Sequence, residues 1–404
     1  MTRSVLFYVQ HLLGIGHLRR ALHLVAGMAR EGFAVTLVSG GEPLPELASA
    51  AARHIVQLAP IRAPDASFRN LVGADGRPVD DALRALRRDK LLAAFAEAAP
   101  DAVLIEAYPF GRRAFRFELE PLIAAARARR PRALVLCSLR DIVVAPEDAK
   151  RRHEIVARVR AEFDAVLVHG DPKLIPLEAS FSLAPEIADR LVYTGYVAPP
   201  DPPYEDAAAA PGAAEVLVSA GGGAVGGELL RAALAARRQG CLAATGWRFL
   251  TGPNLPAAEL AVLTAELPKG VAVERYRADF PRLLRRCRVS VSQAGYNTVL
   301  DILAAGIPAV LVPFAEMAET EQTLRAERLA ACGVVEMVAS AELAPDRLVA
   351  AIERALVRRP ATLAVDTTGA RRTALAIGDM LTDRAAPGTC RKFNIPPGDY
   401  RIGK

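Results

Sequence analysis

A histidine behind a glycine-containing loop is the first candidate for chemistry in this 404-residue chain. In the run QHLLGIGHLRR (10–20), Gly14 and Gly16 allow a tight turn, and His17 opens the helical stretch that follows. The ordinary pKa of histidine lies near neutral pH, so His17 is a candidate general base, and we expect activity to rise with pH through the histidine range. A histidine at this position can also simply cap the helix, and the residues alone leave both interpretations open.

A second glycine-rich loop, VSAGGGAVGGELL (218–230), again separates a predicted strand from a predicted helix. Gly221, Gly223 and Gly226 have the GxGxxG spacing of dinucleotide sites. Such sites need an acidic residue at the end of the next strand to hold the ribose, and the run 247–252 ends without one. The pattern therefore disfavours NAD and indicates a helix N-terminus that attracts phosphate.

The stretch VSVSQAGYNTVLDILAAGIPAVLVPF (289–314) joins a strand, a turn and a helix start. Gly295 is expected to give the turn, and Asn297 or Thr298 to cap a helix whose amides can bind a diphosphate. Asp301 lies one turn further on, where a carboxylate can accept hydrogen bonds from ribose hydroxyls. A first-turn acid can instead complement only the helix dipole, and this alternative stays open.

Four further polar residues stand where a predicted element begins or ends. Glu106 and Asp141 follow apolar runs that are typical of strands, and either carboxylate can orient His17 or act as a structural cap. Glu321 and Gln322 begin a helix after an acid-rich loop and are expected at the edge that binds ligand, although helix starts often have this composition.

Two sets of alternating strands and helices must position these residues. Continuous apolar runs separated by helical stretches predict parallel sheets covered on both faces, and such sheets bind ligands at the carboxyl ends of their strands. The predicted strands are 4–9, 34–39, 54–59, 102–107, 133–138 and 165–170, then 215–220, 247–252, 270–275, 289–292, 309–314 and 334–338. Helical periodicity marks 18–30, 79–98, 112–130 and 148–161, and 60–78 is expected to be a long functional loop.

The proline-rich run 199–214 predicts a linker between two α/β domains. We expect an N-terminal domain over 1–198 and a second domain over 215–364. A C-terminal helix and tail, 365–404, follow them.

Composition excludes several classes of protein. Hydrophobic residues make up 52 % of the chain and charged residues 24 %, which is typical of a globular protein and not of a membrane bundle. The net charge of +6 is spread over the chain, with no basic, aromatic-rich block that would indicate nucleic acid. Five scattered cysteines without CxxC spacing favour reduced thiols over a zinc site or a disulfide framework. The sequence has no Asp-x-Asp pair, P-loop or GxSxG motif.

The run SQAGYNTVLDILAAGIPAVLVPF, followed by ETEQ, resembles the donor-binding half of glycosyltransferase family 28. Asp301 stands where this family has a glutamate, and Arg325 stands near an expected asparagine. The loops 14–17 and 219–224 are similar to the family's other two glycine-rich loops. The residues that match the motif are Gly295, Thr298, Val299, Gly306, Pro308 and Gln322.

This resemblance implies the GT-B fold, an α/β architecture of two Rossmann-like domains whose parallel sheets face each other across a cleft. It also implies that the C-terminal helix crosses back to the first domain. His17, with Asp141 or Glu106, is then expected to be catalytic. The residues expected to bind the donor are Gly14, Gly16, Ser219, Gly221, Gly222, Gly223, Gly295, Asn297, Thr298, Asp301, Glu321 and Gln322.

The resulting prediction is a cytoplasmic glycosyltransferase that moves a hexosyl or N-acetylhexosaminyl group from a nucleotide-diphospho-sugar to a hydroxyl acceptor. We expect inversion at the anomeric carbon, a UDP-sugar as co-substrate, and no metal, cofactor or nucleic-acid partner. The acceptor can be a small molecule, a glycan or a lipid-linked molecule, with peripheral membrane contact left open and no transmembrane segment. The GIGHLRR loop is also similar to nucleotide-sugar hydrolases of this architecture, and a non-catalytic nucleotide-sugar-binding subunit is a further alternative.

Overall fold

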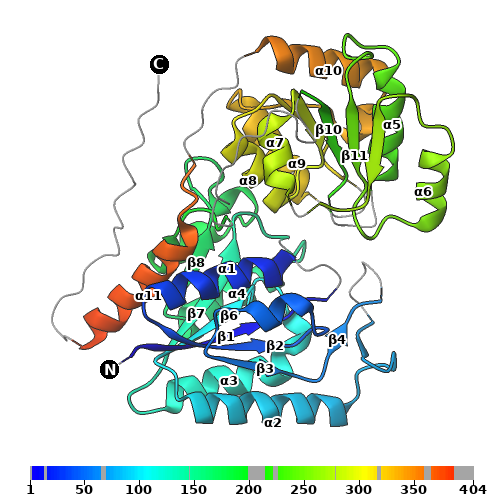
Figure 1. Ribbon diagram of the computed structural model, residues 1–404. Coiled ribbons are helices and arrows are strands. Elements are labelled where there is room, and N and C mark those ends of the chain that lie inside the picture. The colour runs from blue at the N-terminus through cyan, green and yellow to red at the C-terminus, as the bar shows by residue number, and fades with distance from the viewer. Residues whose placement is uncertain are drawn as a thin grey trace. The chain divides into compact units, whose positions relative to one another are not determined.

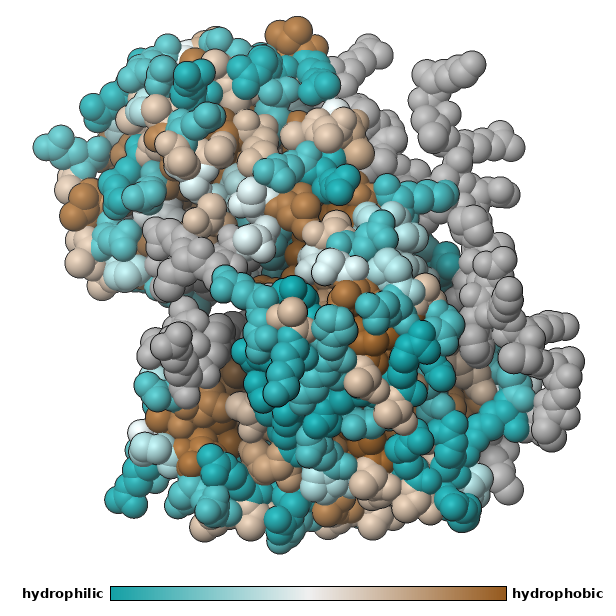
Figure 2. Space-filling view, turned by 180° about the vertical axis from the view of Figure 1, so that it is seen from behind, coloured by the Kyte–Doolittle hydropathy of each residue, from teal (hydrophilic) through white to brown (hydrophobic). Residues whose placement is uncertain are grey.

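The computed structural model describes residues 2–12, 16–64, 70–144, 146–198, 214–221, 226–277, 279–315, 320–358 and 365–385. The chain divides into two compact units (Figure 1). The described part of the N-terminal unit is 2–198 with 366–385, and that of the C-terminal unit is 214–365. No helix in these ranges has both the length and the apolar character to cross a membrane. Hydrophilic side chains predominate on the face shown in Figure 2.

A seven-stranded parallel sheet forms the centre of the N-terminal unit, in the spatial order β3-β2-β1-β6-β7-β8-β9. The order changes direction between β1 and β6, which is where parallel sheets of this kind open a site at the strand ends. The strands are β1 (Ser4–Val9), β2 (Ala34–Ser39), β3 (His54–Gln57), β6 (Ala102–Glu106), β7 (Leu134–Arg140), β8 (Ala165–His169) and β9 (Leu191–Tyr193).

Helices cover both faces of this sheet because its strands alternate two sets of buried apolar side chains. One core packs Tyr8 and Ile105 against α2, α3 and α4. The other packs Phe7 and Leu104 against α1 and α11. The helices are α1 (Gly16–Arg30), α2 (Asp81–Ala98), α3 (Arg116–Ala128), α4 (Ala149–Glu162) and α11 (Gly369–Ala385), with short 3₁₀ turns η1 (Pro45–Ser49), η2 (Arg113–Phe115), η3 (Leu177–Ala179) and η4 (Ala184–Arg190).

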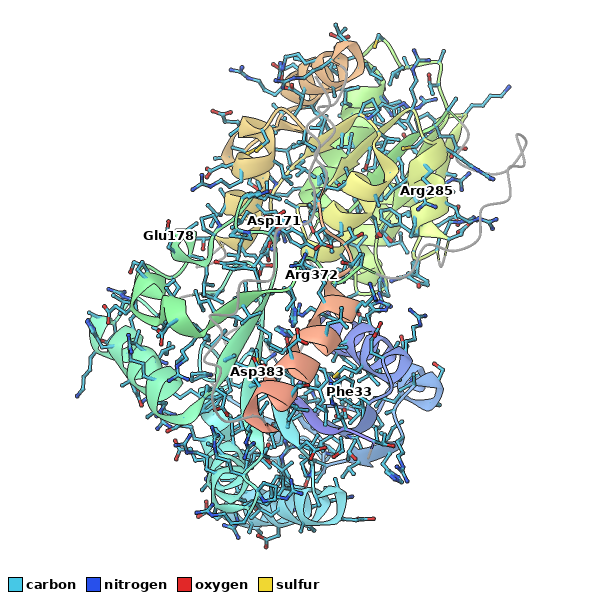
Figure 3. The ribbon with its side chains drawn as sticks, turned by 90° about the vertical axis from the view of Figure 1, so that its left-hand side faces the viewer. Phe33, Asp171, Glu178, Arg285, Arg372 and Asp383 are labelled. Carbon is cyan, nitrogen blue, oxygen red and sulfur yellow. The ribbon has the colours of Figure 1, made fainter. Side chains whose placement is uncertain are left out.

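The last described helix, α11, packs against α1 of the N-terminal unit (Figure 3). The two helices approach so closely that a Cβ at Gly27 would lie 2.7 Å from the backbone of Ala370. The Arg371 guanidinium also donates to the Glu31 carboxylate at 2.9 Å. Residues from both ends of the chain therefore build one hydrophobic core.

The segment 60–78 is more regular than the loop that its composition predicts. β4 (Ile61–Arg62) and β5 (Val72–Gly73) pair antiparallel in it, while 65–69 lie outside the described residues. The predicted long loop thus contains a short β-pair, which was not predicted because such pairs carry too few residues to show periodicity. Strand β9 was also not predicted, for the same reason.

The C-terminal unit has a six-stranded parallel sheet in the order β12-β11-β10-β13-β14-β15, which changes direction between β10 and β13. Its strands are β10 (Val216–Ser219), β11 (Trp247–Leu250), β12 (Val271–Glu274), β13 (Val289–Ser292), β14 (Ala309–Leu311) and β15 (Glu336–Met337). Its helices are α5 (Gly227–Arg237), α6 (Ala257–Thr264), α7 (Phe280–Arg286), α8 (Tyr296–Ala305), α9 (Glu321–Ala331) and α10 (Pro345–Val357), with the 3₁₀ turn η5 (Ser340–Glu342).

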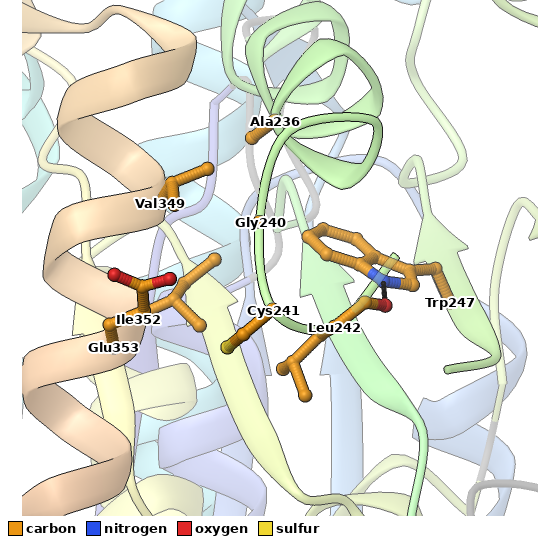
Figure 4. A pocket seen from close by; sticks show the side chains of 8 residues that line it. All are labelled: Ala236, Gly240, Cys241, Leu242, Trp247, Val349, Ile352 and Glu353. Atoms are coloured by element: carbon orange, nitrogen blue, oxygen red, sulfur yellow. Dashed lines mark hydrogen bonds between the residues drawn. The ribbon is translucent and has the colours of Figure 1, made fainter. Parts of the chain in front are cut away.

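Helices α5 and α10 pack together on one face of this sheet. Trp247 of β11 packs beside both helices, and its indole N–H donates to the Leu242 carbonyl at 3.1 Å (Figure 4). The side chains around this point leave a small hollow lined largely by apolar groups. The predicted fold class, two α/β units each with its own parallel sheet, is confirmed.

Candidate functional site

Glu106 organises the polar site of the N-terminal unit. It ends β6 beside the point where the strand order reverses, and its side chain is fully buried. Its Oε1 accepts from Arg20 and lies 2.9 Å from His17 Nδ1. Burial by itself would raise the pKa of Glu106, but the Arg20 charge and the His17 hydrogen bond outweigh burial and hold the pKa well below its usual range. Glu106 is therefore a carboxylate at neutral pH.

His17 is the second residue of α1, and its side chain is 23 % exposed. Arg20 Nη2 also lies 3.2 Å from His17 Nδ1, but Arg20 makes its closer contact with Glu106. Because an ionised carboxylate only accepts, His17 Nδ1 carries the hydrogen and Nε2 keeps its lone pair. The imidazole therefore contacts Glu106 and has the tautomer that a base acting through Nε2 requires.

The pKa of His17 is lowered to about 3. Burial is the largest cause, the positive charge of Arg112 adds to it, and the hydrogen bond to Glu106 opposes it. His17 is thus neutral well below pH 6.5. This lowered pKa replaces the expectation that activity follows a titration in the ordinary histidine range, because the sequence does not show the burial of His17 or its approach to Arg112.

Glu106, and not Asp141, is the acid that the structure brings to His17. Asp141 follows β7 and is buried, and its Oδ1 accepts from the Ile142 amide at 3.0 Å. Gly170 packs against this residue, so that a Cβ added at Gly170 would lie only 2.7 Å from the Cβ of Asp141. Tight packing and a hydrogen bond from the adjacent backbone amide favour the interpretation of Asp141 as a structural cap.

Arg20 is a residue of this site that the sequence analysis missed. Its i, i+3 spacing from His17 places both side chains on one face of α1, so the motif His-x-x-Arg could have indicated it. Gly16 begins α1, and a Cβ there would meet nothing within 4 Å. Gly14 lies outside the described residues, as do Gly222 and Gly223.

In the C-terminal unit, the loops after β10 and β13 lie at the corresponding reversal of strand order. Ser219 ends β10, and its hydroxyl lies 3.4 Å from the Gly221 amide. Gly221 has φ of +71°, a conformation that favours glycine. The sequence analysis did not predict Gln293, whose side-chain amide lies beside Gly221 and Gly226. A Cβ added at Gly221 would lie 3.6 Å from this amide, and a Cβ added at Gly226 would lie 3.4 Å from it.

The start of α8 differs from its prediction in one respect. Gly295 is the N-cap, so Asn297 and Thr298 lie inside the first turn and cannot cap it. Gly295 has φ of −63°, which any residue adopts, and a Cβ there would meet nothing within 4 Å. As the N-cap, Gly295 offers the first-turn amides no side-chain acceptor of its own. The glycine therefore leaves space in front of these amides.

Asp301 lies beyond the first turn of α8 and is partly buried. None of the described residues donates a hydrogen bond to its carboxylate. Burial raises the pKa of Asp301 to about 7, while the Arg285 charge acts in the opposite direction. The interpretation of Asp301 as a first-turn acid is excluded, and an acid in this position is suited to accept hydrogen bonds from a ligand.

Helix α9 supports the turn that precedes α8. Gln322 Oε1 accepts from the Ala294 and Phe314 amides at 3.0 and 3.2 Å. Arg325 donates to the Ala294 carbonyl at 3.0 Å and pairs with the buried Glu321 at 2.9 Å. Gln322 thus stabilises the β13–α8 turn directly, and Glu321 does so through Arg325.

The fold and the arrangement of these loops define a two-domain protein of the GT-B class. Solved glycosyltransferases show the same fold. The calicheamicin glycosyltransferase CalG4 matches with a TM-score of 0.60 and 19 % identity over 96 % of this chain and all of that chain. Acinetobacter baumannii MurG matches with a TM-score of 0.58 and 17 % identity over 94 % of this chain and all of that chain.

Residues 217–375 match the model of the glycosyltransferase family 28 C-terminal domain. The C-terminal unit is thus similar to this domain, and the predicted resemblance to family 28 is confirmed. A relative from Rhizobium johnstonii, named a UDP-N-acetylglucosamine–N-acetylmuramyl-(pentapeptide) pyrophosphoryl-undecaprenol N-acetylglucosamine transferase, is 31 % identical over 32 % of this chain. A protein of the same name from Brucella anthropi is 32 % identical over 33 % of this chain. The match spans just over a third of these relatives' length, 36 % and 38 %.

Proposed function

We propose that the protein is a glycosyltransferase that moves a sugar from a nucleotide-diphospho-sugar to a hydroxyl acceptor. The observation that carries this proposal is the start of α8, which lies within the segment matched by the family 28 model. It combines a helix N-terminus whose N-cap is a glycine with the partly buried carboxyl group of Asp301. Amides at a helix N-terminus suit a diphosphate, and a carboxylate suits ribose hydroxyls.

A UDP-sugar is the proposed donor, in keeping with the names of the relatives that match this segment. The chain spans just over a third of those relatives, so their acceptor is not carried over to it. The acceptor is proposed only as a molecule with a hydroxyl group.

The proposed reaction inverts the anomeric carbon in a single displacement. The acceptor oxygen bonds to the anomeric carbon while His17 Nε2 takes the hydroxyl proton. The bond from that carbon to the diphosphate oxygen breaks, and its electron pair leaves with the diphosphate. The α8 amides stabilise the negative charge that develops there. Glu106 stabilises the imidazolium that forms.

Nucleotide binding to the full chain tests this proposal directly. With UDP as the probe, Asp301→Ala is expected to raise the Kd by roughly 5- to 150-fold, because a hydrogen bond to a charged group is worth about 1–3 kcal/mol. The wild-type Kd should also rise as the pH falls below about 7, since Asp301 must lose its proton to accept. Isothermal titration calorimetry at several pH values measures both effects.

The exposed Asp346 at the start of α10 provides a matched control. Asp346→Ala removes an acid from the same unit and should leave UDP affinity and its pH dependence unchanged. Equal affinity of wild type and Asp301→Ala for UDP would contradict the placement of the ribose. Failure of the wild type to bind any nucleoside diphosphate or to turn over any nucleotide sugar would contradict the proposed function itself.

Turnover is expected to need no divalent cation. The sequence contains no Asp-x-Asp pair, and the helix amides can neutralise charge on the diphosphate. The measurement is the rate of sugar transfer before and after exhaustive treatment with EDTA. A loss of activity that magnesium or manganese restores would show that this prediction is wrong.

A further inference from the structure

A second histidine, which is fully buried, is connected to the proposed base through Glu106. His169 ends β8 and is fully buried. Its Nε2 lies 2.9 Å from Ser138 Oγ, and its Nδ1 lies 2.9 Å from Thr194 Oγ1. Ser138 Oγ in turn lies 2.5 Å from Glu106 Oε2. The connection thus runs across four neighbouring strands of the sheet, from β6 to the residue that follows β9.

The register of the sheet places these groups at one edge. Glu106 is directly paired with Ser138 between β6 and β7, and His169 ends the next strand. Thr194 follows β9, which pairs with β8. Adjacent parallel strands therefore place these polar side chains, which are distant in sequence, in one line along the carboxyl edge of the sheet.

The chemistry of the groups fixes the direction of the two hydrogen bonds nearest Glu106. The ionised Glu106 can only accept, so the Ser138 hydroxyl donates to it. Ser138 Oγ then accepts from His169 Nε2–H. Burial and, to a smaller extent, Arg20 lower the pKa of His169 to about 3, so the imidazole is neutral and its Nδ1 accepts from the Thr194 hydroxyl.

The two oxygens of Glu106 have different partners. Oε1 contacts His17 and Arg20, whereas Oε2 accepts from Ser138. The Ser138 bond prevents rotation of the carboxylate and keeps Oε1 in line with His17 Nδ1. The arrangement therefore controls which nitrogen of His17 carries the proton.

We propose that Ser138 and His169 are positioning residues for the proposed transferase, which fix Glu106 and thereby keep Nε2 of His17 as the proton-accepting atom. Neither residue reaches the reacting atoms in this proposal. It rests on the proposed function for its catalytic consequence, but its statement about the tautomer of His17 can be measured without turnover.

The kinetic test compares Ser138→Ala, His169→Leu and His169→Gln. Removing groups that orient a reactive side chain typically costs about 10- to 100-fold, so Ser138→Ala and His169→Leu should lower kcat by that factor without changing the donor KM. His169→Gln keeps an N–H near the position of Nε2 and should recover part of the loss. In a His17→Ala background, Ser138→Ala should have no further effect, because it acts only through His17.

Ser180→Ala is the matched control. The Ser180 hydroxyl accepts from the Val143 amide at 3.1 Å in the same unit. This variant should alter stability without lowering kcat. A purely structural role of Ser138 would instead give equal effects in the wild-type and His17→Ala backgrounds, and no rescue by glutamine at 169. Either of these results would overturn the proposal.

Nitrogen-15 NMR of labelled histidine supplies a readout that does not depend on activity. In the wild type, His17 should show a protonated Nδ1 and an unprotonated Nε2, and Ser138→Ala should shift part of the population to the other tautomer. An unchanged His17 tautomer in both Ser138→Ala and His169→Leu would contradict the proposed positioning. If the predicted shift occurs in a protein that turns over no nucleotide sugar, the proposed function fails and the positioning of His17 stands.

Discussion

Replacement of His17 by alanine is expected to slow the chemical step by about 10²- to 10⁴-fold, which is the usual contribution of a general base. UDP affinity should remain close to that of the wild type, because the residues proposed to bind the nucleotide belong to the C-terminal unit. Single-turnover kinetics with a nucleotide sugar and an acceptor measure the first effect, and calorimetry measures the second. His153→Ala is the control, since this exposed histidine contacts only the backbone of its own helix in the described hydrogen bonds.

The pH dependence provides a second readout for His17. Because its folded-state pKa lies near 3, His17 is already neutral at pH 5 and can accept a proton throughout the range from pH 5 to 8. The rate of the chemical step at saturating donor should therefore show no rise with a midpoint near 6.5. Such a rise in the wild type, absent from a His17 variant, would contradict the neutral imidazole.

The same experiment separates the alternatives. Fast release of sugar from donor and water alone would identify a hydrolase, whereas a transferase should hydrolyse its donor slowly until an acceptor is added. A binding subunit would turn over no donor, with or without His17. Wild-type rates of transfer by His17→Ala would remove His17 from the mechanism.

The second large effect concerns stability and involves the buried pair of Arg87 and Glu118. Both side chains are fully buried, and two hydrogen bonds of 2.6 and 2.9 Å join the guanidinium to the carboxylate. Arg87 also donates to the carbonyls of Gly40 and Ala59, which follow β2 and β3. Arg87→Met is expected to lower the free energy of unfolding by about 3–5 kcal/mol, because the buried Glu118 loses its charge partner and, of the described donors, keeps the Tyr8 hydroxyl.

Arg84→Met on the same helix is the control for this prediction. Arg84 pairs with Asp81 at 2.7 Å, but both side chains are exposed, so its loss should cost less than about 1 kcal/mol. Urea denaturation followed by circular dichroism compares the two variants, and hydrogen exchange in β1, β2 and β3 locates the effect. Equal unfolding free energies for the two variants would contradict a structural role for the buried pair.

The sequence by itself determined the two parallel sheets and most of their strands. Runs such as 5–9 and 165–168 are continuously apolar because their strands are buried on both faces, and this property is visible in the sequence without any contact. The rule that ligands bind at strand ends then selected His17, Glu106 and Asp301. Strands of two or three residues, such as β5 and β9, lack enough positions to show such a pattern.

The tertiary structure decided which of the selected residues contact one another. Glu106 and Asp141 both follow apolar runs, but only the packing of α1 on the sheet brings Glu106 to His17. Likewise, Gly295 and not Asn297 is the N-cap because α8 begins at Tyr296. Sequence patterns locate the start of a helix only to within about two residues, so they do not distinguish these two positions.

The protonation states of the site residues are also determined by the tertiary structure. The pKa values of His17, His169 and Asp301 depend on burial and on charges that are distant in sequence. Local patterns show which side chains tend to be buried, but they do not show the neighbours with which a titrating group shares its surroundings. Register between strands sets those neighbours, and therefore the folded chain alone determines which nitrogen of His17 can accept a proton.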